Sequence, residues 1–255
     1  MELHVLGCHG GETPKHRTSA FVLDKKLAID AGALTSGLDI KDQCALKAIL
    51  VSHAHLDHVR DLSTIADTRA QASAPPLTIA GTKFTLDLLK KHFFNNLLWP
   101  DFAAIPSKAH PTIVYQEIPL EKPTDVVGYR VRAIHVHHTI DTCGFVIEGK
   151  GGAIAYSGDT GPTDRLYEVI DATPNMRALL MEVSFPNDEQ KLATVSGHHT
   201  PKSLAIDLAK IEKPKDLATL LYHIKPHFQK EVERELAKLK GLNLTVLALG
   251  DRFKL

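Results

Sequence analysis

The sequence has little cysteine, no long apolar run and no excess of charge of either sign. Its three cysteines, Cys8, Cys44 and Cys143, have no C-x-x-C spacing between them. This usage indicates a reducing compartment rather than a disulfide framework. No apolar run approaches the roughly 18 residues that a membrane span needs, and the first residues lack the pattern of a signal peptide. We therefore expect a cytoplasmic protein that does not contact a membrane.

The balance of acidic and basic residues excludes a strong electrostatic field around the whole molecule. Thirty Lys and Arg residues cancel thirty Asp and Glu residues, so nothing draws the chain as a whole onto nucleic acid. With 255 residues, 44% of them hydrophobic, the chain can fill a substantial core. No low-complexity linker divides it, and we predict a single domain over residues 1–255. Histidine is abundant, at fifteen residues, and its clusters should mark the chemistry.

Short β-type runs alternate with turn clusters along the chain. The predicted strands cover residues 3–7, 19–24, 27–30, 48–52, 77–81, 112–118, 129–136, 143–149, 152–158, 177–183 and 217–224. Helical periodicity predicts helices at residues 82–94, 162–171, 201–211 and 227–240. This mixture is typical of an α/β protein with strands inside. The least regular stretch, residues 92–111, holds the only tryptophan and suggests either a lid or a surface loop with a buried aromatic anchor.

The segment VSHAHLDH, at residues 51–58, gathers four metal-ligand side chains after an apolar strand. They are His53, His55, Asp57 and His58. Alternate residues of an extended turn share a side, so this segment can direct ligands towards two neighbouring points. Four such side chains within six residues are hard to explain as solvated surface groups. The segment therefore predicts a site for two metal ions.

Two metal ions need further ligands from other strand ends. Asp159 follows an apolar strand in SGDTG, where its carboxylate can approach and bridge two ions. His223 ends the strand LLYHI. The segment HVHHTID offers His135, His137 and His138, and strand alternation alone does not choose among them.

The succession of H-x-H-x-D-H, a later histidine, an aspartate in S-G-D-T and a final histidine resembles the metallo-β-lactamase superfamily. The resemblance implies a four-layer αββα sandwich with a dinuclear metal site at one edge. His138, followed six positions later by Gly144 and Phe145, is similar to the phosphodiesterase and tRNA-processing branch, so His138 is favoured and His137 is the alternative.

The resemblance also implies a division of the ligands. The first metal would be held by His53, His55 and His138 and the second by Asp57, His58 and His223, with Asp159 between them. Imidazole and carboxylate ligands suit two divalent ions, with Zn²⁺ favoured and Mn²⁺ or Fe²⁺ as alternatives.

Residues outside this ligand set point to the substrate. Glu182 lies in a predicted buried strand, and His198 precedes a Thr-Pro helix start, so an acid can orient a histidine that protonates an oxygen leaving group. The motifs S-G-D-T-G-P, S-G-H-x-T-P and H-x-K-P resemble the class II cyclic-nucleotide phosphodiesterases, and Lys225 in the last motif can contact a phosphate oxygen. In the alternative interpretation, Thr200 and Pro201 only cap a helix and Lys225 is solvated.

We therefore expect hydrolysis of a 3′,5′-cyclic nucleotide, with cyclic AMP favoured, to a 5′-nucleotide. Two metal ions about 3.5–4 Å apart lower the pKa of a bridging water. Asp57 would steer this water, and His198, polarised by Glu182, would protonate the departing ribose oxygen. Arg60 and Asp61 depart from the class at the site entrance, where we expect apolar and small residues, and this leaves the substrate open.

Three other functions fit parts of the pattern. A tRNA 3′-processing-like enzyme, or another hydrolase of small phosphodiesters, would share the metal site, but neutral charge and the lack of a long basic insertion disfavour nucleic acid. A thioester or lactam hydrolase would leave Glu182 and His198 without a role. A non-catalytic metal-binding protein has no need of a complete open site. The expected partner is a small phosphodiester, and a homodimer is also compatible with the sequence.

Overall fold

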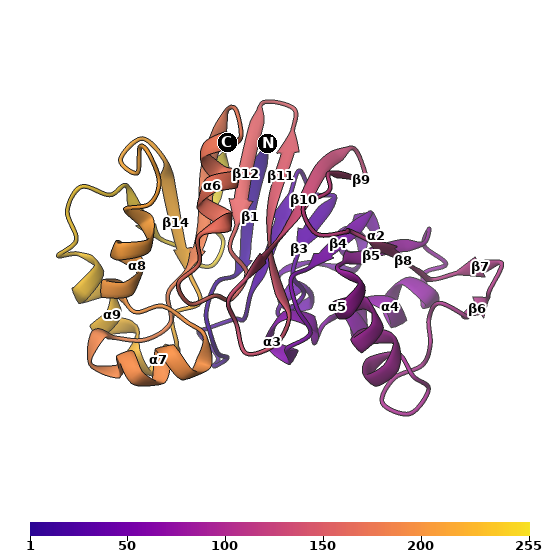
Figure 1. Ribbon diagram of the computed structural model, residues 1–255. Coiled ribbons are helices and arrows are strands. Elements are labelled where there is room, and N and C mark those ends of the chain that lie inside the picture. The colour runs from indigo at the N-terminus through magenta and orange to yellow at the C-terminus, as the bar shows by residue number, and fades with distance from the viewer.

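The computed structural model describes residues 1–255 as two facing seven-stranded sheets with helices on both outer sides (Figure 1). In spatial order the first sheet contains β16 (Arg252–Lys254), β1 (Glu2–Gly7), β2 (Ala20–Leu23), β3 (Leu27–Ile29), β4 (Ala48–Val51), β5 (Leu77–Gly81) and β8 (Ile113–Glu117). The second contains β15 (Leu244–Val246), β14 (Ala218–Tyr222), β13 (Met176–Glu182), β12 (Gly152–Tyr156), β11 (Thr142–Gly149), β10 (Tyr129–Val136) and β9 (Thr124–Val126). A short hairpin pairs β6 (Pro106–Ser107) with β7 (His110–Pro111).

Helices cover the outer face of each sheet. The first half of the chain contributes α1 (Leu34–Gly37), α2 (Ile40–Ala45), α3 (Leu56–Val59), α4 (Leu62–Gln71) and α5 (Lys83–Leu88), which continues as the π-helical turn η1 (Leu89–Phe93). The second half contributes α6 (Arg165–Ala172), α7 (Gln190–Ser196), α8 (Pro201–Leu208) and α9 (Gln229–Leu236), with short 3₁₀ turns η2 (Asn187–Glu189) and η3 (Pro226–Phe228). The order helix, sheet, sheet, helix is the predicted four-layer αββα sandwich.

Strand periodicity explains the layers. In β4, Ala48 and Leu50 belong to the cluster packed between the two sheets, while Ile49 and Val51 belong to the cluster beneath α1, α4 and α5. Successive side chains of a strand point to opposite faces, so strands that are apolar throughout must be covered on both sides. The second sheet follows the same rule with α6, α8 and α9.

All eleven predicted strands and all four predicted helices are present, with ends shifted by a few residues. The elements that were not predicted are the helices α1, α2, α3, α4 and α7 and the short strands β6, β7, β9, β15 and β16. In α4 the buried face includes Arg69, whose guanidinium donates to the carbonyl oxygens of Gln43, Cys44 and Leu46 at the end of α2. A charged residue on the buried face interrupts the apolar period, which is why the pattern of this helix is weak.

The irregular stretch at residues 92–111 has the predicted aromatic anchor. Phe93, Phe94 and Phe102 are buried against the first sheet. Trp99 is 37% exposed, and its indole nitrogen donates to the carbonyl of Ser63 at 3.2 Å.

Strand direction places the site. The strands β12, β13 and β14 run parallel, and β10 runs in the same direction because it is antiparallel to β11, which is antiparallel to β12. Their carboxyl ends therefore meet at one edge, where α3 and α7 lie (Figure 1). The chain termini lie at the opposite edge, where the Met1 ammonium donates to the Leu255 carbonyl at 2.8 Å. None of the helices is both long and apolar enough to cross a membrane.

Candidate metal centre

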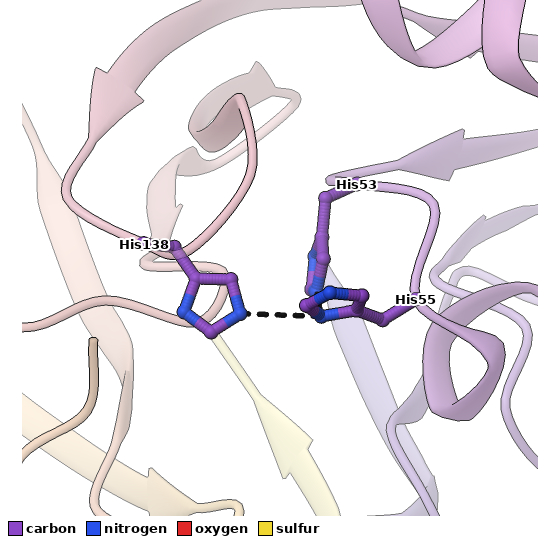
Figure 2. Close-up of side chains that lie close together, drawn as sticks. All are labelled: His53, His55 and His138. Atoms are coloured by element: carbon purple, nitrogen blue, oxygen red, sulfur yellow. Dashed lines mark hydrogen bonds between the residues drawn. The ribbon is translucent and has the colours of Figure 1, made fainter. Parts of the chain in front are cut away.

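Three histidines converge from the two sheets. His53 and His55 follow β4, and His138 follows β10; Figure 2 shows their rings directed at one another. The Nδ1 atom of His55 lies 3.1 Å from Nε2 of His53 and 3.2 Å from Nε2 of His138. Burial holds the pKa of His53 well below its usual value, so its ring is neutral, which is the form that binds metals. The carbonyl of Gly197, 3.0 Å from Nδ1 of His138, leaves Nε2 of that ring as the ligand atom.

A second group of four residues lies beside the first. It contains Asp57, His58, Asp159 and His223. Oδ2 of Asp159 lies 3.2 Å from Nε2 of both His58 and His223, and 3.9 Å from Nε2 of His53 in the first group. Oδ2 of Asp57 lies 3.4 Å from Nε2 of His223. Asp159 is therefore placed to reach both groups, as a bridging carboxylate must.

Two buried atoms of this group lack hydrogen-bond partners, and this tests whether the residues suit a metal. Nε2 of His58 and Oδ1 of Asp159 are both buried and make no hydrogen bond, although Nε2 of His58 lies 3.2 Å from the other oxygen of Asp159. A buried polar atom without a partner is costly unless something else satisfies it, and a cation would satisfy both atoms. Five imidazoles and two carboxylates in two adjoining groups are a suitable donor set for two divalent ions. The residues present fit the predicted metals.

Asp30 orients a ligand of the second group, His58, and the sequence did not predict this role. It is fully buried directly after β3, with a left-handed backbone (φ 55°). Its Oδ2 accepts from Nδ1 of His58 at 2.7 Å and from the Tyr156 hydroxyl at 2.6 Å, and the Ser52 amide donates to Oδ1 at 2.8 Å. Burial opposes charge on His58, but Asp159 and Asp30 outweigh it and hold the pKa of His58 well above its usual value. The only signal in the sequence is an aspartate that ends a predicted strand.

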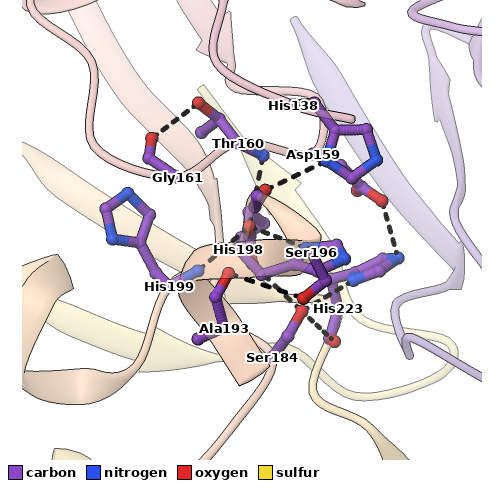
Figure 3. A network of polar contacts seen from close by, with 12 residues as sticks. His138, Asp159, Thr160, Gly161, Ser184, Ala193, Ser196, His198, His199 and His223 are labelled. Atoms are coloured by element: carbon purple, nitrogen blue, oxygen red, sulfur yellow. Dashed lines mark hydrogen bonds and ion pairs between the residues drawn. The ribbon is translucent and has the colours of Figure 1, made fainter. Parts of the chain in front are cut away.

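The predicted pair of Glu182 and His198 is formed. Nδ1 of His198 lies 3.0 Å from Oε1 of Glu182, which also accepts from the amides of Thr160 at 3.2 Å and His199 at 3.3 Å. Figure 3 labels His198, Thr160 and His199, the three partners of this oxygen. Ser184, a further residue that the sequence did not reveal, donates to Oε2 at 3.1 Å. Burial raises the pKa of Glu182 to about 7 and lowers the pKa of His198 to about 4. Ionisation of either group therefore depends on what binds beside it.

His198 lies directly against the metal groups. Its ring stacks on His223, with centroids 5.2 Å apart, and meets the ring of His138 edge-on at 5.0 Å. Ser184 also contacts His223, with its hydroxyl 2.9 Å from Nδ1. One buried polar network thus joins the Glu182 and His198 pair to a predicted metal ligand.

The remaining predicted residues lie as follows. Asp57 and His58 belong to the single helical turn α3, not to an extended turn, because the chain turns helical directly after His55. His137 is exposed, whereas the structure brings His138 to the first group. Lys225 is partly buried and forms no ion pair with a carboxylate.

The four-layer fold and the paired His and Asp groups at its edge define a metallohydrolase. The chain belongs to the β-lactamase superfamily, because the model of the beta-lactamase superfamily domain matches residues 33–224. It is 26% identical to a probable 3′,5′-cyclic-nucleotide phosphodiesterase of Yersinia pestis, over 90% of this chain and 79% of the relative. It is 25% identical to a zinc phosphodiesterase ELAC protein 2 homolog of Caenorhabditis elegans, over 72% of this chain and 26% of the relative.

Solved structures confirm the fold. The crystal structure of unliganded yeast PDE1 matches with a TM-score of 0.83 and 19% identity, and 98% of each chain is covered. Together with the family match, this confirms the αββα sandwich and the hydrolase class that the sequence predicts.

Proposed function

We propose that the protein is a metal-dependent phosphodiesterase that hydrolyses 3′,5′-cyclic nucleotides, with cyclic AMP favoured. The observation that carries the proposal is the buried pair of Glu182 and His198, 3.0 Å apart, against the ring of His223. Hydrolysis of a phosphodiester needs a proton donor for its alkoxide leaving group, and an oriented histidine supplies one. The name of the Yersinia pestis relative supports the same substrate class.

The ligand roles in this proposal follow the two groups. His53, His55 and His138 would hold one divalent ion, Asp57, His58 and His223 the other, and Asp159 both. Bound divalent ions lower the pKa of a water and neutralise the charge that develops on a phosphoryl group. Zinc suits these ligands, with manganese and iron as alternatives.

The side chains then have distinct tasks. Asp57 accepts a hydrogen bond from the attacking water and directs it towards phosphorus. The Glu182 carboxylate fixes the Nδ1 hydrogen of His198, so Nε2 carries the transferable proton. An anionic phosphodiester beside this ring favours its charged form and opposes the effect of burial on its pKa. His198 donates this proton to the leaving ribose oxygen, and Lys225 offers a cation to a phosphate oxygen.

The test compares two variants. His198→Ala should keep its metal content and lose turnover of cyclic AMP by a factor on the order of 10²–10⁴, because a general acid contributes that much. Asp159→Ala should lose both metal and turnover. Metal is measured by elemental analysis and turnover with cyclic AMP, cyclic GMP and a 2′,3′-cyclic nucleotide in parallel. A His198→Ala protein as fast as the parent would show that the assigned acid is wrong.

A second candidate is cleavage of RNA, which the likeness to a ribonuclease Z of Mycobacterium bovis favours, with 27% identity over 57% of this chain and 51% of the relative. The balanced charge argues against a long polyanionic substrate. A short RNA added to the same substrate series separates the two functions, because each predicts that a different substrate is consumed.

A further inference from the structure

Arg60 lies one helical turn beyond a predicted metal ligand. It follows the last residue of α3, the turn that carries Asp57 and His58. Residues three apart on a helix are neighbours on one face, so Arg60 lies on the same face as Asp57. Both side chains reach solvent, with 42% of Arg60 and 31% of Asp57 exposed. A cation therefore lies on the solvent-exposed face of the turn that carries the predicted ligand Asp57.

The guanidinium of Arg60 is held by the neighbouring carboxylate of Asp61. Its Nε donates to Oδ1 of Asp61 at 3.0 Å, and Asp61 is almost fully buried. The other oxygen of Asp61 accepts from the amide of Thr35 at 2.8 Å and from its hydroxyl at 2.6 Å. Because Asp61 is fixed by these bonds, the Arg60 side chain is oriented before any substrate arrives.

Glu12, from a distant part of the chain, pairs with Arg60. Nη1 of Arg60 donates to Oε2 of Glu12, whose side chain is 40% exposed. Glu12 belongs to the loop between β1 and β2, and this loop is fastened to the His223 segment. The amide of His223 donates to the Cys8 carbonyl at 2.7 Å, and the amide of Gly10 donates to the Ile224 carbonyl at 3.1 Å. The pair thus links the turn that carries Asp57 and His58 to a loop bonded to the His223 segment.

We propose that Arg60 contacts the substrate and exchanges Glu12 for a phosphate oxygen when a phosphodiester binds. The proposal rests on the proposed function and names a further specificity-determining residue for it. An exposed ion pair stabilises a fold little, so Glu12 can be displaced easily. Arginine has five N–H donors, of which Asp61 and Glu12 engage two, and its planar fork suits phosphate oxygens. In the free protein, Glu12 competes with the substrate for the same cation.

The two partners therefore have opposite predicted effects. Arg60→Ala should raise KM for the cyclic nucleotide by roughly tenfold, because it removes a charge-assisted contact. Glu12→Gln should lower KM, because it removes the competing carboxylate. The double variant should behave like Arg60→Ala. The pair of Arg252 and Glu2, 2.9 Å apart and also exposed, lies at the opposite edge, so Arg252→Ala and Glu2→Gln serve as matched controls with an unchanged KM.

If the Arg60–Glu12 ion pair only fixes the loop between β1 and β2, a different result is expected. Arg60→Ala and Glu12→Gln would then shift KM in the same direction, and this outcome would overturn the proposal while leaving the phosphodiesterase function intact. If the metal-loaded parent hydrolysed no phosphodiester, the proposed function would fail, and calorimetric titration with inorganic phosphate would still test Arg60. In that titration Arg60→Ala should weaken binding and Glu12→Gln should strengthen it, and equal effects would again refute the exchange.

Discussion

At the scale of single residues, the carboxylate of Asp30 organises the site most strongly. It is fully buried and accepts hydrogen bonds from His58, Tyr156 and Ser52. By accepting from Nδ1 of His58 it leaves Nε2 of that ring for the metal. The outer partner of a ligand histidine typically governs metal affinity as well as ring orientation.

Asp30→Ala should therefore lower both stability and metal affinity. The change removes the acceptor of four hydrogen bonds from buried donors, two of them from Ser52, and we expect the free energy of unfolding to fall by about 3–5 kcal/mol. Metal affinity should fall by roughly 10–100-fold, measured by competitive titration with a chelating dye. Asp24→Ala is the control, since Asp24 accepts from Tyr129 and Glu2 far from the metal centre. It should cost stability and leave metal affinity unchanged.

Individual residues also show where sequence reasoning stops. The seven ligand candidates were predicted because their types and spacing are unusual, and the structure brings all seven together. Strand alternation could not choose among His135, His137 and His138, because β10 ends at Val136 and the following turn decides which ring faces the ligands; the family resemblance favoured His138. Asp30 and Ser184 are common residue types at strand ends, so only their partners in space distinguish them.

At the scale of elements, α8 connects the two loops that carry the chemistry. Asp207 on this helix is almost fully buried, and its Oδ2 accepts from the amide of Thr163 at 2.9 Å. The same oxygen lies 3.5 Å from Nε2 of His199. Thr163 belongs to the loop that follows β12 and contains Asp159, while His199 adjoins His198. A single carboxylate thus sets the spacing of the bridging ligand and the proposed acid.

Asp207→Asn is expected to reduce kcat by about tenfold or more, because small misplacements of reacting groups are costly. KM should change less, since the carboxylate is buried and is not placed to contact substrate. Steady-state kinetics measures kcat and KM, and a thermal melt checks that the variant is folded. Ile206→Ala is the matched control, because this neighbour on α8 is 62% exposed. Equal kcat for the Asp207→Asn variant and the parent would remove the positioning role.

Helices and strands were predicted well where the hydrophobic pattern of the segment is set by burial alone. Strands buried on both faces appear as apolar runs, and the eleven that were predicted form most of both sheets; only the outer strands β9, β15 and β16 were not predicted. The helices α2 and α4 were not predicted because polar residues, Gln43 and Arg69, lie on their buried faces. Both side chains donate hydrogen bonds to backbone carbonyls. Whether a buried polar side chain finds such partners depends on the folded structure, which the local hydrophobic pattern does not reveal.

At the scale of the whole molecule, the ligand groups join the two sheets. His53, His55, Asp57 and His58 come from the edge of the first sheet, and His138, Asp159 and His223 from the edge of the second. An apolar cluster drawn from both sheets fills the space between them. We infer that residues 1–255 fold as one cooperative domain. Bound metal would link the two sheets at the edge where the ligands meet.

Removing metal should therefore lower the melting temperature of the whole chain in one transition. Bound ligand stabilises the native state by about 4 kcal/mol at a concentration 1,000 times its Kd. Scanning calorimetry of metal-loaded and chelator-treated protein measures the shift. Asp159→Ala should melt at the same temperature with and without chelator. Two separate transitions in the metal-free parent would contradict a single cooperative domain.

The position of Trp99 has an experimental consequence. It is the only tryptophan, and its indole is tied to the carbonyl of Ser63, just after the turn that carries Asp57 and His58. Its fluorescence emission is therefore a built-in optical reporter of the contact between the irregular stretch and the N-terminal end of α4. Quenching by iodide would reveal whether nucleotide binding tightens that contact, without any added dye.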